Sequence, residues 1–175
     1  MPKIMKNTWS LPRYKREWRD ICALLPAYLP DGANGSYILY EDGSVEQVNF
    51  SFSWVLDDLF AYLHSNKQLL QRQSRRITAQ MGNQRGRRLP LILSKDFCLV
   101  PIRVRLTSSP YHEANGYVRL NKVEDFSEQK GKSGCKIWFT NQLELEVLDN
   151  LYTLRGNMAL AAKMQEYLRE GHTSA

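Results

Sequence analysis

Ten cationic side chains lie between Lys67 and Arg105, and the only carboxylate among them is Asp96. Eight of the ten are arginines, whose planar guanidinium groups match the oxygens of a phosphate. A polyanion that binds such a set of cations releases counterions, and this release drives affinity without regard to base sequence. The block therefore indicates a binding surface for a polyanion, with nucleic acid as the leading candidate.

The candidate contact residues fall into three groups. They are Lys67, Arg72, Arg75, Arg76, Arg85, Arg87, Arg88, Arg103 and Arg105. The first four stand towards the end of an expected helix and in the chain beyond it, and Arg72, Arg75 and Arg76 are expected to contact phosphates from there. The next three follow Gly82 and surround Gly86, which indicates a loop or hairpin tip. The last two alternate with Val104 and Leu106, so a period of two predicts that both arginines project from the outer face of a strand.

A block of this charge is also compatible with three roles that involve no nucleic acid. In the first role the block is a solvated basic face that keeps the protein soluble. In the second it binds an acidic protein or a membrane surface. Alternatively, the chain neutralises itself. The segment Ile21–Asn66 has six carboxylates and no lysine or arginine, so it is able to fold over the block.

No set of residues has the spacing of a catalytic or metal site. The three histidines are far from one another and from the cysteines, whereas zinc ligands come in close pairs. Gly131-Lys132-Ser133 lacks the earlier glycine of a phosphate-binding loop and is interpreted as a turn. His64 does not share a helix face with Asp58, and no serine or cysteine has the context of a nucleophile elbow. We expect no enzyme activity, no metal and no cofactor.

Length and composition are those of one globular domain. The chain has 175 residues, with 43% hydrophobic and 24% charged residues. Its apolar runs are far shorter than the ~20 residues of a membrane span, so we expect a cytoplasmic protein without a membrane partner. Cys22, Cys98 and Cys135 are widely spaced, which favours buried thiols over a disulfide framework. We expect a basic, aromatic extension over residues 1–20 and one domain over residues 21–170.

These candidate residues depend on the elements that position them. Residues 36–40 and 45–50 are rich in β-formers and flank Asp42-Gly43, which predicts a hairpin. A helix capped by Ser51 or Ser53 is expected to begin near Trp54 and to continue towards Arg72. A second helix is expected over residues 151–168, capped by Asp149 or Asn150. The further strands are expected over residues 21–25, 77–81, 89–93, 97–106, 117–120, 135–140 and 143–147. Strands joined mostly as hairpins predict an α+β fold, with a largely antiparallel β-sheet, a central helix and a C-terminal helix.

In this order of segments the chain resembles the bacterial competence transcription factor ComK family. The resemblance spans roughly residues 21–168. It rests on the first apolar run ending in Pro26, the hairpin over residues 37–48, Leu89-Pro90-Leu91-Ile92, Leu99-Val100-Pro101 with the Ser-rich residues 107–110, and Lys136–Asn141. The family's glycine-rich stretch has no glycine in its counterpart, residues 65–72.

The resemblance implies a transcription activator that binds A/T-rich sites in the minor groove of double-stranded DNA as a homodimer or higher homo-oligomer. It also implies turnover through an adaptor of a Clp protease, and a place at the bacterial nucleoid. Arg85, Arg87 and Arg88 would then enter the minor groove, because narrow A/T-rich grooves attract arginine.

Two alternatives are kept. An RNA-binding protein would use the same patch with Tyr111 and Tyr117 as stacking groups. A non-catalytic interaction adaptor would recruit a basic partner through the acidic segment Ile21–Asn66.

Overall fold

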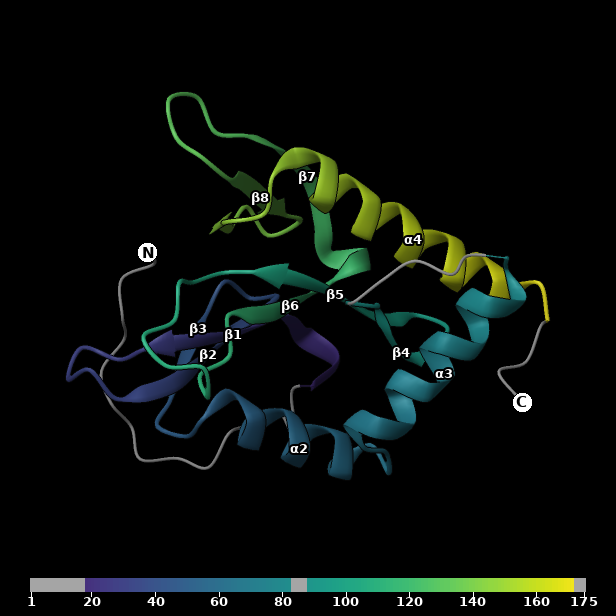
Figure 1. Cartoon of the computed structure of the whole chain (residues 1–175), viewed down its shortest axis with the longest axis horizontal. Coiled ribbons are helices and arrows are strands. Elements are labelled where there is room, and N and C mark those ends of the chain that lie inside the picture. Colours follow the sequence, from purple (N-terminus) through teal and green to yellow (C-terminus); the bar gives the residue numbers. More distant parts are fainter. Residues whose placement is uncertain (1–17, 83–87, 172–175) are drawn as a thin grey trace.

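The computed structural model describes residues 18–82 and 88–171, and its centre is a six-stranded sheet (Figure 1). The strands lie in the order β3-β2-β1-β6-β5-β4, and every neighbouring pair is antiparallel. They are β1 (Ile21–Tyr28), β2 (Asn34–Tyr40), β3 (Val45–Val48), β4 (Leu91–Ser94), β5 (Phe97–Arg103) and β6 (Asn115–Arg119).

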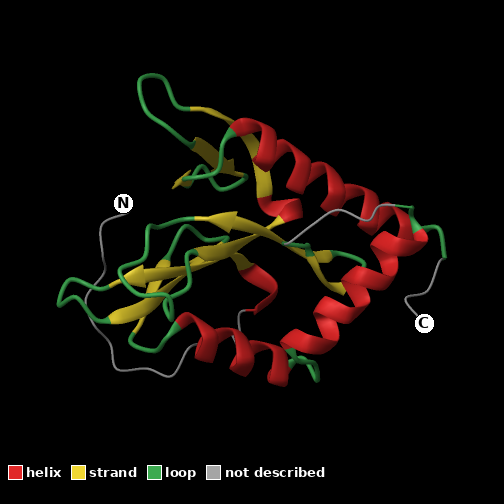
Figure 2. Ribbon diagram, viewed as in Figure 1, coloured by secondary structure: helices red, strands yellow, loops and turns green. Residues whose placement is uncertain are grey.

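Two layers cover this sheet, one on each face (Figure 2). Helix α2 (Phe52–Tyr62) lies against one face, and α3 (Lys67–Gln80) runs beside the edge strand β4, with Leu70 in the apolar cluster on the α2 side and Ile77 in the cluster on the α4 side. The other face is covered by α4 (Leu151–Arg169) and by a three-stranded antiparallel sheet made of β7 (Val123–Glu128), β8 (Cys135–Phe139) and β9 (Glu144–Val147). Short 3-10 turns, η1 (Trp18–Asp20) and η2 (Leu120–Lys122), precede β1 and follow β6.

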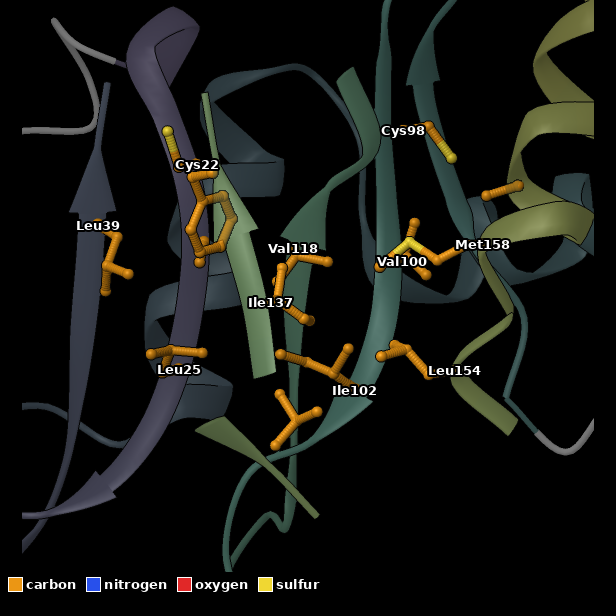
Figure 3. Packing of buried hydrophobic residues seen from close by; sticks show 14 of the residues in the cluster. Cys22, Leu25, Leu39, Cys98, Val100, Ile102, Val118, Ile137, Leu154 and Met158 are labelled. Carbon is orange, nitrogen blue, oxygen red and sulfur yellow. The ribbon is translucent and has the colours of Figure 1, made fainter. Parts of the chain in front are cut away.

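The two faces of the central sheet bury separate apolar clusters. On the α4 side, Val100 and Val118 pack with Ile137, Leu154 and Met158 (Figure 3). On the α2 side, strand residues such as Leu24, Ile38 and Leu99 pack against the apolar stripe of α2. Strand β1 lies between both layers, which explains why its sequence is apolar at nearly every position instead of alternating.

Strand β1 continues through Pro26, where the sequence suggested an end. Proline has no N–H to donate, so it is tolerated only where a ladder bond is absent. The pairing of β1 with β6 is confined to Ala23 and Leu24, and Pro26 pairs only with β2. Gly116 enables this arrangement, because a Cβ at that position would stand 2.6 Å from the carbonyl oxygen of Leu24.

The α+β class, the hairpin and the helix caps are confirmed. Gly43 has a φ of +85° at the predicted hairpin turn between β2 and β3. The hydroxyl of Ser51 accepts from the N–H of Trp54 at the start of α2, and Asn150 caps α4 in the same way. The predicted pairing of the last two strands is the pairing of β8 with β9.

The predicted helix towards Arg72 is wrong, because this segment forms two helices. Helix α2 ends at Tyr62, and His64 takes a φ of +57° in the turn that follows. The side chain of Asn66 then caps α3. A residue in the left-handed region cannot continue a right-handed helix, so the chain changes direction here.

Residues 77–81 were predicted as a strand, but residues 77–80 are the end of α3 and Met81 caps it. The hydroxyl of Thr78 bonds back to the carbonyl of Ser74, 2.9 Å away, a local bond that threonine makes in helices. Strand β7 was not predicted. Its residues are half-exposed and mostly polar, so it had no apolar alternation to indicate it.

All three cysteines are buried with free thiols, as the sequence predicts. Burial raises the pKa of Cys22 to about 11 and that of Cys98 to about 12, so both remain protonated at neutral pH. Among the described residues, no helix has the length and apolar character needed to cross a bilayer.

Candidate nucleic-acid interface

The outer face of α3 carries three of the predicted contact residues. Successive residues of a helix turn by about 100°, so Arg72, Arg75 and Arg76 share one sector of the surface. All three are exposed, and the opposite sector buries Leu70 and Ile77. The helix has no aspartate or glutamate. We call Arg72, Arg75 and Arg76 the arginine face.

Buried hydroxyls and a side-chain cap hold α3 in place beneath this face. The side chain of Asn66 accepts from the N–H of Leu69 at 2.9 Å. On the buried side, Ser74 Oγ donates to the carbonyl of Pro90 at 2.5 Å and so ties the middle of α3 to the chain before β4. At the far end, Tyr167 of α4 donates to Gln80 at 3.1 Å. The arginine face is therefore carried by a helix fixed at its start, middle and end.

A cleft of about 420 Å³ opens beside the arginine face. Lys67, Gln71 and Arg75 form one wall, since residues four apart follow one side of a helix. Its other described lining residues come from α2, the chain before β4, strands β4, β5 and β6, and the loop before β6. They are Phe52, Leu56, Arg88, Leu89, Leu91, Pro101, Pro110, Tyr111, His112, Glu113, Ala114, Asn115 and Tyr117. Three predicted contact residues, Lys67, Arg75 and Arg88, thus meet in one place.

Arg88 is both a cleft residue and a structural link. Its Nη1 donates to Asn115 Oδ1 at 2.8 Å and lies 3.7 Å from Asp149 Oδ1. Asp149 is buried and also accepts from the backbone N–H of Arg103 at 2.5 Å. The charge of Arg88 is therefore partly compensated, and its side chain is held in a defined position at the mouth of the cleft. Arg85 and Arg87 lie outside the described residues.

Arg103 is exposed at the last position of β5, as predicted. It has the same strand parity as Phe97, Leu99 and Pro101, which face α2 and the cleft. Both backbone groups of Arg103 are hydrogen-bonded. Its N–H donates to Asp149, and its carbonyl accepts from the N–H of Leu148 at 2.7 Å. Arg103 therefore presents a cation on the side of the sheet that faces α2 and the cleft.

Arg105 does not project outward, contrary to the prediction. Strand β5 ends at Arg103, so the period of two does not extend to it. Arg105 is only 9% exposed, with its guanidinium 4.3 Å from the centre of the Tyr28 ring. Its Nε donates to the carbonyl of Glu113 at 2.6 Å, and its Nη2 donates to Asn34 Oδ1 at 2.7 Å. Burial lowers the pKa of Arg105. The residue joins three segments of the fold.

Arg119 is a second buried arginine, and no pattern in the sequence indicated its burial. It is 8% exposed and lies 4.0 Å from the centre of the Phe97 ring. Its guanidinium donates to the carbonyls of Arg19 and Asp96. Burial lowers the pKa of Arg119 as well.

The loop that closes one side of the cleft is fixed to β1 by Tyr28. The Tyr28 hydroxyl lies 2.8 Å from Ser108 Oγ and 2.8 Å from His112 Nδ1, and it accepts from the N–H of Ser108. The hydrogen bonds to Ser108 lower the pKa of Tyr28. His112 and Asn115 of the cleft were not predicted, because only the folding of this loop against β1 brings them to the cleft that α3 also lines.

The acidic segment contributes an ion pair to a different region. Glu41 lies 2.9 Å from Lys122 of η2, which is not part of the basic block. Among the described residues, no group of three or more His, Cys, Asp or Glu side chains has the arrangement of a metal site.

Comparison of the chain with models of protein families, with curated proteins and with solved structures gave no match.

Proposed function

We propose that this protein is a double-stranded DNA-binding transcription regulator related to the ComK family. The observation that carries the proposal is the arginine face, which presents three exposed cations from one fixed helix that contains no carboxylate. Phosphate contacts from such a surface supply affinity and orient a protein on a duplex.

Three more cations, at the cleft and at the end of β5, extend this surface. Lys67 and Arg88 stand beside the arginine face at the cleft, and Arg103 is exposed on the same side of the sheet. Arg105 is removed from the proposed contacts, because its guanidinium is occupied by Tyr28, Asn34 and the carbonyl of Glu113.

The preference for A/T-rich minor grooves rests on the resemblance and on the sequence of residues 82–88. Arginine is attracted to narrow A/T-rich grooves, and groove width then supplies the sequence preference. Binding as a homo-oligomer, turnover by a Clp protease and a place at the nucleoid are parts of the same proposal and rest on the resemblance alone.

The test compares two variants with the same loss of charge. One replaces Arg72, Arg75 and Arg76 with glutamine. The control replaces Lys130, Arg155 and Lys163, which are exposed on other elements, with glutamine. Fluorescence polarisation measures the affinity for A/T-rich and G/C-rich duplexes at several salt concentrations. The arginine-face variant should bind about a hundredfold more weakly, and its slope of log affinity against log salt should fall by about 3.

The control variant should keep a slope within about 1 of the wild type. Equal loss in both variants would mean that only net charge matters, and the arginine face would not be the interface. Salt-independent binding, or no binding to either duplex, would contradict DNA binding altogether.

A second candidate is supported by Tyr111, which is 90% exposed at the rim of the basic cleft. An exposed aromatic ring beside cations is the arrangement on which bases of single-stranded nucleic acid stack. Tyr117, the other predicted stacking residue, is largely enclosed and lies against Phe52. If RNA is the partner, Tyr111→Ala lowers affinity for single-stranded RNA about tenfold and leaves duplex DNA binding unchanged.

A further inference from the structure

The cleft beside α3 has the dimensions of a small-molecule site. Its volume of about 420 Å³ lies within the range of ligand pockets. A DNA duplex is far too wide to enter a space of this size, so the proposed DNA contacts along the outer face of α3 leave its interior unused. The cleft therefore needs an explanation of its own.

One part of the cleft attracts negative charge. Lys67 and Arg75 reach it from the first and third turns of α3, and Arg88 reaches it from the chain before β4. Glu113 is the one carboxylate among the described lining residues, against three cations, of which Arg88 is partly compensated by Asp149 behind it. Charge-assisted hydrogen bonds from two arginines and a lysine are the usual means of holding a phosphate or carboxylate group. Asn115 orients Arg88 at 2.8 Å, so this group is partly preorganised.

The remaining part of the cleft is apolar. Phe52 and Leu56 of α2 line it together with Leu91 and Pro101 of the sheet. Tyr117 lies against Phe52 with a ring separation of 6.3 Å and an angle of 25° between the rings. An apolar wall next to a cationic group matches a ligand that has an anionic head and a hydrophobic body.

The side chains that enclose the cleft are held in place before any ligand binds. The loop carrying His112 and Glu113 is fixed to β1 by the hydrogen bond between Tyr28 and His112 and by the stacking of Arg105 on Tyr28.

We infer that this cleft binds a small organic anion. Its phosphate or carboxylate group is held by Lys67, Arg75 and Arg88, and its aromatic or branched aliphatic body lies against Phe52, Leu56 and Pro101. The inference does not rest on DNA binding, and it adds a small-molecule site to the proposed function.

Isothermal titration calorimetry without nucleic acid tests the inference, with phenyl phosphate and benzoate as probes. Inorganic phosphate and phenol supply the head and the body separately. At least one of the two organic anions should bind with a Kd below about 1 mM, and inorganic phosphate and phenol should each bind at least about tenfold more weakly. The anion that binds more tightly identifies the head group.

Two single variants of α3 locate the site. Arg75→Gln should weaken binding of the probe about tenfold, because it removes a charge-assisted contact. Arg72→Gln removes the same charge from an exposed position outside the cleft and should leave the Kd unchanged within about twofold. Thermal melting of both variants confirms that they are folded. In amide NMR spectra, the probe should shift Lys67, Asn115 and Tyr117.

Lack of binding by both organic anions at about 10 mM would overturn the inference. Equal weakening by Arg72→Gln and Arg75→Gln would also overturn it, because the probe would then be responding only to net charge. Failure of DNA binding leaves these titrations unaffected, whereas Arg72→Gln lowers DNA affinity alone. The two proposals can therefore fail separately.

Discussion

The arginines of α3 and the two buried arginines beside the six-stranded sheet differ in how the fold uses them. On α3, Arg72, Arg75 and Arg76 project from the side of the helix that faces away from the core. At opposite ends of the sheet, Arg105 and Arg119 are buried, each against an aromatic ring and each donating to at least one backbone carbonyl.

The difference shows that a basic segment of sequence is not one functional unit. Guanidinium is weakly hydrated, stacks on aromatic rings and donates in several directions, so arginine is able to join distant segments inside a fold. On the outside of a helix, the same group is accessible to a partner. Arg72 and Arg105 belong to one run of cations in the sequence, yet the first is exposed and the second stabilises the domain. Predictions that separate stability from binding test this distinction.

The largest expected effect on stability is that of Arg119→Ala. The change removes a cation from the Phe97 ring, leaves the carbonyl of Arg19 without this donor, and opens a cavity between η1 and the sheet. The free energy of unfolding should fall by about 3 kcal/mol, measured by urea denaturation. Arg119→Lys keeps the charge but loses the planar donor group, so it should recover only part of the loss. Full recovery by lysine would show that charge alone matters at this position.

Arg105→Ala follows with a smaller effect. It removes two hydrogen bonds and the stacking on Tyr28, at a site closer to the surface, and should lower the free energy of unfolding by about 2 kcal/mol. The slope of log DNA affinity against log salt should stay unchanged at temperatures where the variant is folded. A smaller slope for this variant would place Arg105 in contact with phosphate and return it to the interface.

The elements that were predicted correctly are those with local determinants. Asp42-Gly43 specifies its turn, and Ser51 and Asn150 cap the helices that they precede. The interpretation of Ile77 and Thr78 as a strand was wrong because β-branched residues are also compatible with a helix when one side is buried. In α3 that side packs against β4 and α4.

The burial of Arg105 depends on contacts that no local pattern contains. Its acceptor Asn34 is separated from it by 71 positions, and the ring on which it stacks belongs to β1. A period of two predicted the exposure of Arg103 correctly, but β5 ends at that residue. The cleft likewise requires α3, β6 and the loop before β6 to be assembled. The sequence therefore locates the cations along the chain, whereas the tertiary contacts decide which of them are exposed to a partner.

The third prediction concerns Tyr117, an uncharged residue in the middle of β6 that lines the cleft. Burial raises the pKa of Tyr117 to about 12, above the ordinary tyrosine value of about 10. Between these values the unfolded chain loses the proton first, so this group makes the folded state less stable as pH rises from 10 to 12. At pH 11 the contribution is about 1 kcal/mol. Tyr117→Phe should show a shallower fall in the free energy of unfolding over this range than the wild type. Parallel curves would show that the hydroxyl ionises as easily in the folded protein.

The smallest effect on stability is expected for Arg72→Gln, and it completes the comparison. Arg72 is exposed on α3, and glutamine has nearly the same helix propensity as arginine. The free energy of unfolding should therefore change by less than about 0.5 kcal/mol. Affinity for duplex DNA should still fall severalfold at low salt, because one phosphate contact is lost. A variant that destabilised the protein while leaving its DNA affinity intact would place Arg72 in the structural class with Arg105 and Arg119. The division between the exposed arginines of α3 and the buried arginines of the sheet would then fail.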